Sequence, residues 1–187
     1  QKDFRFEERA GTLLIRQFER KIHEAKKLPA GPARRDQLER LTEALNAAEL
    51  EHYRLCMENY PTDLAFKYEY AVRLMANKRY NEAIPLFQEA QRDPKRRISA
   101  MGKVGSCFFM KGWYTDAIEI LARAIDVYEI KDDAIAKELQ YNLARAFEEN
   151  GQGDKALEAY RRIAQVDFGY KDVGDRVDRL RADKKPG

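Results

Sequence analysis

A short sequence pattern recurs along this chain at a nearly fixed spacing. Residues 78–84 align without a gap with residues 112–118, so that Ala83 and Ala117 stand 34 positions apart. A third copy places the matching alanine, Ala156, a further 39 positions on, which is one period plus an insertion of five residues. A fixed period of roughly 20 to 50 residues is the signature of an array of repeated units, so the pattern constrains the fold before any single element is considered.

A second small residue lies twelve positions before each of these alanines: Ala71, Gly105 and Ala144. Two helices approach to about 8 to 10 Å only where the side chains that face each other are small. Large apolar residues fill the rest of each seam, as Phe108 and Leu121 do in the second copy. Each unit is therefore predicted to consist of a helix, a tight turn and a second helix.

The 34-residue period, the order of small and large positions and the turn sequence Tyr-x-x-Ala-Ile resemble the tetratricopeptide repeat (TPR). The second copy follows the family pattern best, with Gly105, Phe108, Tyr114, Ala117 and Leu121 in place. The resemblance implies an all-α fold, a right-handed α-solenoid of stacked helix-turn-helix repeats. It covers residues 61–168 as three repeats, at about 64–94, 98–131 and 132–168.

Residues 1–60 are predicted to form a long antiparallel helical hairpin, whose second helix also resembles that of a degenerate repeat. A break at residues 28–32 separates a helix over residues 4–27 from one over residues 34–59. The second helix carries a heptad-like seam of apolar or small positions, which the first helix is expected to cover. The seam residues are Leu38, Leu41, Leu45, Ala48, His52 and Leu55.

Residues 169–187 are predicted to form a capping helix and a tail. Val173, Val177 and Leu180 share one face, and charged residues occupy the opposite face. A stacked array needs such a helix, because its last apolar face is otherwise exposed to water. The run that begins at Phe168 also resembles the closing segment of bacterial TPR proteins. The tail, residues 184–187, is expected to be disordered.

Composition excludes several functional classes. The longest uncharged stretches are about ten residues, whereas a membrane-spanning helix needs roughly 20 apolar residues, so no membrane insertion is expected. The 35 basic and 32 acidic side chains are spread evenly, which disfavours nucleic acid as a partner. The sequence begins at Gln1 without a signal peptide, so we expect a cytoplasmic protein whose natural N-terminus lies upstream.

The chain offers few residues for chemistry. His23 and His52 are the only histidines, and neither lies in a metal-binding or catalytic motif. Cys56 and Cys107 fall on helices where a small apolar filler is expected. No glycine pattern builds a phosphate-binding loop. We therefore predict no enzyme activity, no catalytic residues, no metal and no cofactor.

The TPR resemblance directs attention to the concave groove that the first helices of successive repeats line. In that geometry the groove residues are Tyr68, Glu69, Val72, Lys103, Ser106, Phe109, Tyr141, Asn142 and Arg145. Aromatic side chains would anchor a ligand, while Lys103, Asn142 and Arg145 would bind acidic or carbonyl groups. The expected function is a non-enzymatic protein-protein interaction scaffold that binds a peptide or a partner helix.

Other interpretations stay open. Tyr68 and Phe109 could instead pack against neighbouring helices and leave only charges exposed. The hairpin could serve as an oligomerisation module, although a monomer or a weak homo-oligomer is expected. Binding of single-stranded RNA receives less support because the charge is balanced. A carboxylate clamp for a chaperone tail is disfavoured, since only Lys103 and Asn142 match its residues and Glu138 would repel the ligand.

Overall fold

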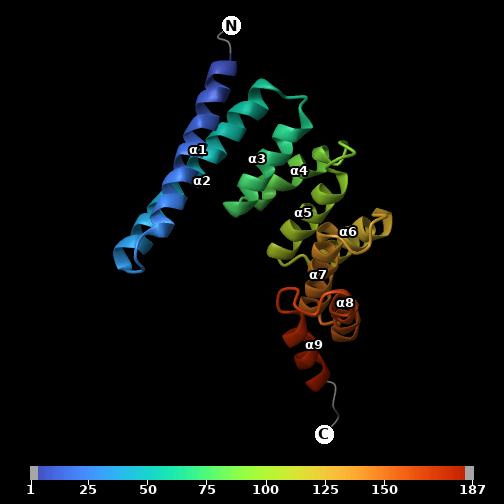
Figure 1. Cartoon of the computed structure of the whole chain (residues 1–187). Coiled ribbons are helices and arrows are strands. Elements are labelled where there is room, and N and C mark those ends of the chain that lie inside the picture. Colours follow the sequence, from blue (N-terminus) through green and yellow to red (C-terminus); the bar gives the residue numbers. More distant parts are fainter. Residues whose placement is uncertain (1–3, 184–187) are drawn as a thin grey trace. The chain divides into compact units, whose positions relative to one another are not determined.

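The protein is entirely helical over residues 4–183, the part of the chain that this computed structural model describes (Figure 1). Nine helices and no strand occur in these residues, which confirms the predicted all-α class. The chain forms two compact units, Gln1–Leu86 and Phe87–Gly187. The predicted tail, residues 184–187, lies outside the described residues.

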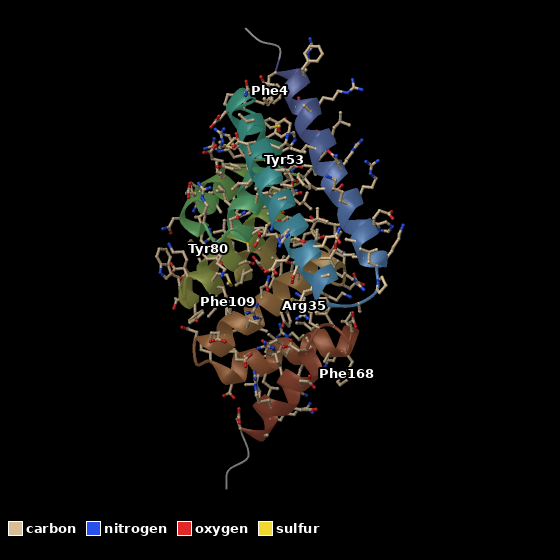
Figure 2. The ribbon with its side chains drawn as sticks, turned by 90° about the vertical axis from the view of Figure 1, so that its left-hand side faces the viewer. Phe4, Arg35, Tyr53, Tyr80, Phe109 and Phe168 are labelled. Atoms are coloured by element: carbon tan, nitrogen blue, oxygen red, sulfur yellow. The ribbon has the colours of Figure 1, made fainter. Side chains whose placement is uncertain are left out.

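The first unit begins with an antiparallel pair of helices, α1 (Arg5–Lys27) and α2 (Pro32–Asn59). Pro32 occupies the first turn of α2, where its missing N–H has no intrahelical partner to lose. Figure 2 shows the two helices side by side, with Phe4 at one end of the pair and Arg35 at the other. The Phe4 ring packs edge-on against Tyr60, with 5.6 Å between centroids, and the Tyr60 hydroxyl donates a hydrogen bond to Glu8.

The predicted seam of α2 faces α1 of the same chain. Gly11 leaves room for the His52 ring, because a Cβ atom at residue 11 would lie 2.3 Å from His52 Nδ1. Nearer the loop, Leu41 lines one cleft with Ala25 of α1 and with Leu28, the residue that follows α1. The order of these contacts along the two helices establishes their antiparallel packing.

Helix α3 (Leu64–Ala76) packs against α2. Asp63 caps its N-terminus by accepting hydrogen bonds from the amides of Ala65 and Phe66. The Arg73 guanidinium lies 4.4 Å from the Tyr53 ring centroid and donates a hydrogen bond to Glu49. Helix α4 (Tyr80–Ala90) follows after a short turn.

The second unit holds α5 (Arg97–Met110), α6 (Tyr114–Val127), α7 (Ala134–Glu149), α8 (Gly153–Val166) and α9 (Val173–Ala182). Its core contains the small residues that the period predicted: Ala117, Ala144 and Ala156 are fully buried. A Cβ atom at Gly105 would lie 2.5 Å from Leu121 Cγ, which is closer than two non-bonded carbon atoms approach. Gly105 therefore marks the point where α5 and α6 touch.

The turn between paired helices recurs with the repeat. Lys78, Gly112 and Gly151 follow α3, α5 and α7, and all three have a positive φ, between 60° and 76°. In each turn the amide of the next residue donates a hydrogen bond to a carbonyl of the preceding helix, as Trp113 does to Phe108. Two of the three positions carry glycine because this backbone conformation disfavours residues with a Cβ atom.

Helix α9 covers the last apolar face of the second unit. Val173 and Val177 are buried in one cluster with Tyr160 and Ile163 of α8, and Leu180 packs at the edge of that cluster. Four charged side chains of α9 were expected opposite this face. Asp175, Asp178 and Arg179 are exposed, whereas Arg176 is half-buried and pairs with Asp172 and Glu148. Helix α9 therefore shields this apolar cluster of the second unit from water.

The close contact at Gly105 is testable by adding one methyl group. We expect Gly105→Ala to lower the free energy of unfolding by about 1 to 3 kcal/mol through overpacking, in spite of alanine's better helix propensity. The matched control is Gly153→Ala in the first turn of α8, where the nearest atom, in Leu180, lies 4.0 Å away. Urea denaturation of both variants measures the difference, and a Gly105→Ala protein as stable as the wild type would contradict the packing.

The covered seam of α2 predicts the oligomeric state. Because α1 occupies the seam within one chain, light scattering should give a mass near the 21.8 kDa of a single chain. Leu41→Glu should destabilise the protein, whereas Leu13→Glu, at a position that is 57% exposed, should not. A stable dimer that Leu41→Glu converts into folded monomers would show that the seam joins two chains instead.

Candidate functional site

Three predicted groove residues of α5 lie on one side of that helix. Lys103, Ser106 and Phe109 are three positions apart, a spacing that keeps side chains close together on a helix surface. All three are half-buried. The Ser106 hydroxyl donates a hydrogen bond to the carbonyl of Gly102, one turn earlier, which fixes its direction.

Helix α7 brings a matching row to the same place. Glu138, Asn142 and Arg145 lie four and three positions apart on α7. Each meets one residue of α5. These six residues are called the α5–α7 face: Lys103, Ser106 and Phe109 on α5, and Glu138, Asn142 and Arg145 on α7.

Three contacts join the two rows. The Lys103 ammonium lies 3.4 Å from a Glu138 carboxylate oxygen. The Asn142 amide donates a hydrogen bond of 3.4 Å to Ser106 Oγ. The Arg145 guanidinium stacks over Phe109, with its Cζ atom 4.3 Å from the ring centroid. An ion pair, a neutral hydrogen bond and a cation–π contact thus follow one another along the face.

Phe109 is only partly available to a ligand. One side of its ring is occupied by Arg145, and the Tyr114 ring lies 5.5 Å away between centroids. The residue is half-buried, so part of its surface packs within the chain and part remains accessible. The packing contacts of Phe109 are therefore present, and its part in binding stays a prediction.

Tyr141 corrects the expectation for the groove wall. Its side chain is 7% exposed, and its ring packs edge-on against Tyr160 and Tyr170. The Tyr141 hydroxyl donates a hydrogen bond of 2.6 Å to Asp172. The segment that follows α8 covers Tyr141, so this ring is part of the core rather than an anchor for a partner.

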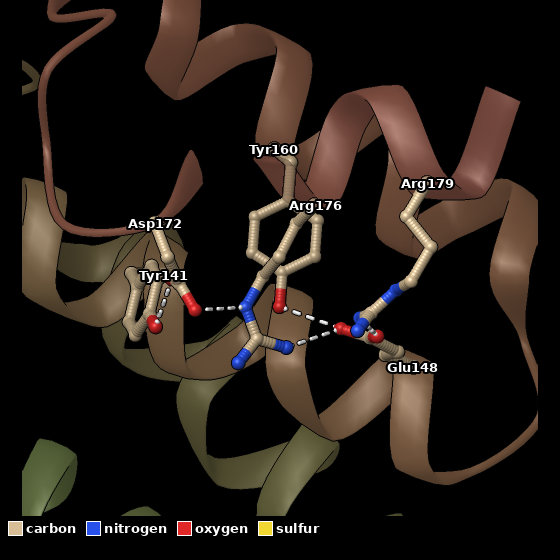
Figure 3. Close-up of polar contacts among 6 residues, drawn as sticks. All are labelled: Tyr141, Glu148, Tyr160, Asp172, Arg176 and Arg179. Carbon is tan, nitrogen blue, oxygen red and sulfur yellow. Dashed lines mark hydrogen bonds and ion pairs between the residues drawn. The ribbon is translucent and has the colours of Figure 1, made fainter. Parts of the chain in front are cut away.

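A polar network continues from Tyr141 across the second unit (Figure 3). Arg176 of α9 binds Asp172 and Glu148, at 2.9 and 2.6 Å. Glu148 also accepts a hydrogen bond from the Tyr160 hydroxyl and pairs with Arg179. One carboxylate at the end of α7 therefore holds side chains of both α8 and α9.

This network shifts the pKa values of its members. Partial burial acts to raise the pKa of Asp172, but hydrogen bonds from Tyr141 and Arg176 outweigh it and hold that pKa below its ordinary value. Burial raises the pKa of Tyr160, and the hydrogen bond to Glu148 raises it further. Both shifts favour the protonation states that the network needs, an ionised Asp172 and a neutral Tyr160.

Sequence reasoning missed Lys171, which lies between α8 and α9. Its ammonium lies 4.3 Å from the centroid of the Tyr141 ring. Burial lowers the pKa of Lys171, Glu138 opposes that shift, and the positive charges of Arg145 and Lys103 add to it. Lys171 is thus close enough to the α5–α7 face to interact with its charges. Because the residue lies beyond the repeats, the repeat pattern contains no signal for it.

The remaining predicted groove residues belong to the first unit. Tyr68, Glu69 and Val72 lie on α3 and are half-buried. Glu69 pairs with Arg73 at 2.6 Å, one turn along the same helix. Their part in a binding surface stays a prediction.

The cysteines and His52, which were considered as catalytic or metal-binding residues, are partly or fully buried. Cys56 and Cys107 are fully buried, and burial raises the pKa of both thiols to about 11, so they are protonated at neutral pH. Burial also lowers the pKa of His52. Residues 4–183 contain no group of three or more acidic, histidine or cysteine side chains placed to hold a metal ion. No helix in this range has the length and apolar character needed to cross a membrane.

The sequence and the fold were compared with known proteins. A family model described as Tetratricopeptide repeat matches residues 68–134 and 111–169, which together span more than half of the chain. The comparison with curated proteins found no match.

Solved structures share the fold at low sequence identity. A crystal structure of MamA is 20% identical, with a TM-score of 0.65, and the match covers 79% of this chain and 83% of MamA. A thermophilic TPR protein in Thermus thermophilus is 19% identical, with a TM-score of 0.62, and 93% and 96% of the two chains are covered. The C-terminal part of a TPR repeat-containing protein from Cytophaga hutchinsonii is 19% identical, with a TM-score of 0.64, over 96% and 74% of the chains.

The lowered pKa of Asp172 predicts a loss of stability in acid. Its contribution is complete above the unfolded-state pKa of about 3.9 and is lost as the pH falls through the lower folded-state value. Asp172→Asn should therefore destabilise the protein at neutral pH and make its melting temperature less sensitive to pH below about 5.

Asp175→Asn serves as the control, because this exposed carboxylate in the first turn of α9, three residues after Asp172, makes no hydrogen bond with any residue from 4 to 183. Melting curves at several acidic pH values measure the effect. Equal acid sensitivity in the wild type and in Asp172→Asn would show that the network is not coupled to stability.

Proposed function

The chain belongs to the tetratricopeptide repeat family, and from this premise we propose that it is a non-enzymatic scaffold that binds a partner protein on the α5–α7 face. TPR repeats generally mediate protein-protein interactions. The proposed ligand is an extended peptide or a helix that carries acidic groups beside an apolar side chain. The surface that receives it combines Lys103, Asn142 and Arg145 with the accessible part of Phe109.

The observation that carries this proposal is the state of Arg145. Its guanidinium is held on the Phe109 ring, but no carboxylate within residues 4–183 forms an ion pair with it. A guanidinium has five N–H donors in one plane, and a contact with the face of a ring does not use them as hydrogen bonds to an anion would. Arg145 is therefore oriented in advance and retains its capacity for an acidic partner.

The neighbouring contacts suit a peptide. Asn142 and Ser106 are joined by a single hydrogen bond, so each keeps polar capacity for a backbone amide or carbonyl group. Phe109 supplies an apolar surface beside them. Alternating apolar and polar contacts are the features by which grooves recognise extended chains.

The alternatives receive less support. Oligomerisation through the α2 seam competes with α1, which covers that seam within one chain. RNA binding would require an extended basic surface, whereas the formal net charge is +3 and acidic side chains accompany most basic ones. Neither alternative accounts for the pre-oriented Arg145.

A display library of random peptides, each about 12 residues long, tests the proposal directly. Selection on the intact protein should enrich acidic peptides that contain one aromatic or large aliphatic residue. Phe109→Ala should weaken the selected peptide about thirtyfold at any salt concentration, equivalent to about 2 kcal/mol. Lys103→Ala combined with Arg145→Ala should weaken it mainly at low salt, because exposed charges are screened.

The controls separate binding from folding and from the opposite side of the repeat. Arg123→Ala, on α6, should leave the affinity unchanged, and melting curves should show that each variant is folded. If the selected peptides lose affinity on changes at α6 and are indifferent to Phe109, Lys103 and Arg145, the α5–α7 face is not the binding surface.

A further inference from the structure

Arg145 and Lys171 are two of the three cations that lie near the Tyr141 ring beside the α5–α7 face, and the third is Arg176. The Lys171 ammonium lies 4.3 Å from the centroid of Tyr141, and Cζ of Arg145 lies 6.0 Å from the same centroid. The cations come from different parts of the sequence, since Arg145 is on α7 and Lys171 precedes α9. Their charges are close enough for Arg145 to lower the pKa of Lys171.

These two cations differ from the basic side chains around them in their lack of an anionic partner among the described residues. Lys103 is paired with Glu138, Lys137 with Asp167, and Arg176 with Asp172 and Glu148. Arg145 and Lys171 form no ion pair with any residue from 4 to 183. The end of the face next to Tyr141 thus holds two positive charges that are not directly paired with a carboxylate of these residues, although Glu138 and Asp172 act on Lys171 from a greater distance.

The backbone at Lys171 adds an independent observation. Lys171 has a φ of 51°, in the left-handed region that residues with a Cβ atom seldom adopt. Hydrogen bonds from Tyr170 to the carbonyl of Asp167 and from Val173 to the carbonyl of Tyr170 hold this turn. Glycine would fit this backbone conformation better, so a lysine here carries a conformational cost. Such strain clusters at functional sites.

We propose that Arg145 and Lys171 together bind one anionic group of the ligand, a carboxylate or a phosphate monoester on a peptide side chain. The planar guanidinium would bind two oxygens of the group, and the ammonium would supply a point charge from the α8–α9 segment. The anion would lie beside Tyr141 without contacting its buried hydroxyl, which is occupied by Asp172. This inference rests on the proposed function, because it assigns the position of the ligand's acidic group on the same face.

The proposal makes Lys171 a ligand-binding residue outside the repeats. Glu138 limits which anions fit, because it remains next to Lys103 and repels a second negative charge at that end. Arg145 lies about two turns along α7 from Glu138, so a charge bound there meets weaker repulsion from Glu138 than one bound at Lys103. The acidic residue of a bound peptide should therefore follow its apolar anchor at Phe109 closely, since Arg145 contacts both sites.

Lys171→Gly is the informative substitution, since it removes the ammonium and relieves the backbone at the same time. A purely structural lysine at this position would leave anion binding unchanged. We expect the variant to melt at or above the wild-type temperature and to lose at least tenfold in affinity for the anion. Lys171→Arg should retain most of the affinity because it keeps the charge.

The matched control is Lys155→Gln. Lys155 of α8 also stacks on a ring, 5.6 Å from the centroid of Phe147, but it does not belong to the α5–α7 face. The probes are three peptides of one sequence, taken from the display selection, that carry glutamate, phosphoserine or glutamine at the acidic position. Calorimetric titration of each into the intact protein identifies which anion is preferred.

The outcomes separate this inference from the function on which it rests. Tenfold weaker binding of the glutamate or phosphoserine peptide to Lys171→Gly, with no change for the glutamine peptide or for Lys155→Gln, supports the shared site. Equal binding of all peptides to Lys171→Gly and wild type, with loss in Phe109→Ala, overturns the site and leaves the proposed function standing. Peptides that bind independently of Phe109, Arg145 and Lys171 would overturn both.

Discussion

The close approach of helices at small side chains is the constraint on which the rest of this structure depends. At Gly105 the backbone of α5 lies so near Leu121 of α6 that no Cβ atom fits. Alanines at Ala117, Ala144 and Ala156 are fully buried in the same unit. Because the helices of each pair lie so close together, the first helices of consecutive repeats become neighbours, and α5 contacts α7. The three contacts of the α5–α7 face depend on this arrangement.

The face itself combines satisfied and unsatisfied polar groups. Its middle contact, between Asn142 and Ser106, and its end contact, between Lys103 and Glu138, are made within the chain. At the other end the charge of Arg145 has an aromatic partner but no anion among residues 4–183. A folded protein normally pairs a half-buried charge, and an uncompensated one is therefore informative about recognition. The proposed ligand would supply the missing charge.

The sequence predicted the parts of the molecule that repeat. The period located Gly105 and the buried alanines, and the TPR resemblance identified groove positions on α5 and α7 of which Lys103, Ser106, Phe109, Asn142 and Arg145 are half-buried. Tyr141 was wrongly assigned to the groove because its surroundings depend on the segment after the repeats, where Asp172 accepts a hydrogen bond from its hydroxyl. Lys171 could not be found from any period, since its position depends on a single turn with a positive φ. Sequence patterns predict the features that all repeats share. The contacts of the segment after the repeats, which has no repeating pattern, can be identified only from the three-dimensional structure.

The network around Glu148 has a consequence for the choice of chain boundaries. A fragment that ended with the last repeat, near Phe168, would lack Asp172, Arg176 and Arg179. The Tyr141 hydroxyl would then lose its acceptor, and Glu148 would retain only Tyr160 of the partners described above. Val173 and Val177 would also be absent from the core that they share with Tyr160. The smallest autonomous piece of the second unit therefore extends through α9, and the edge of the repeat motif is not the edge of the folding unit.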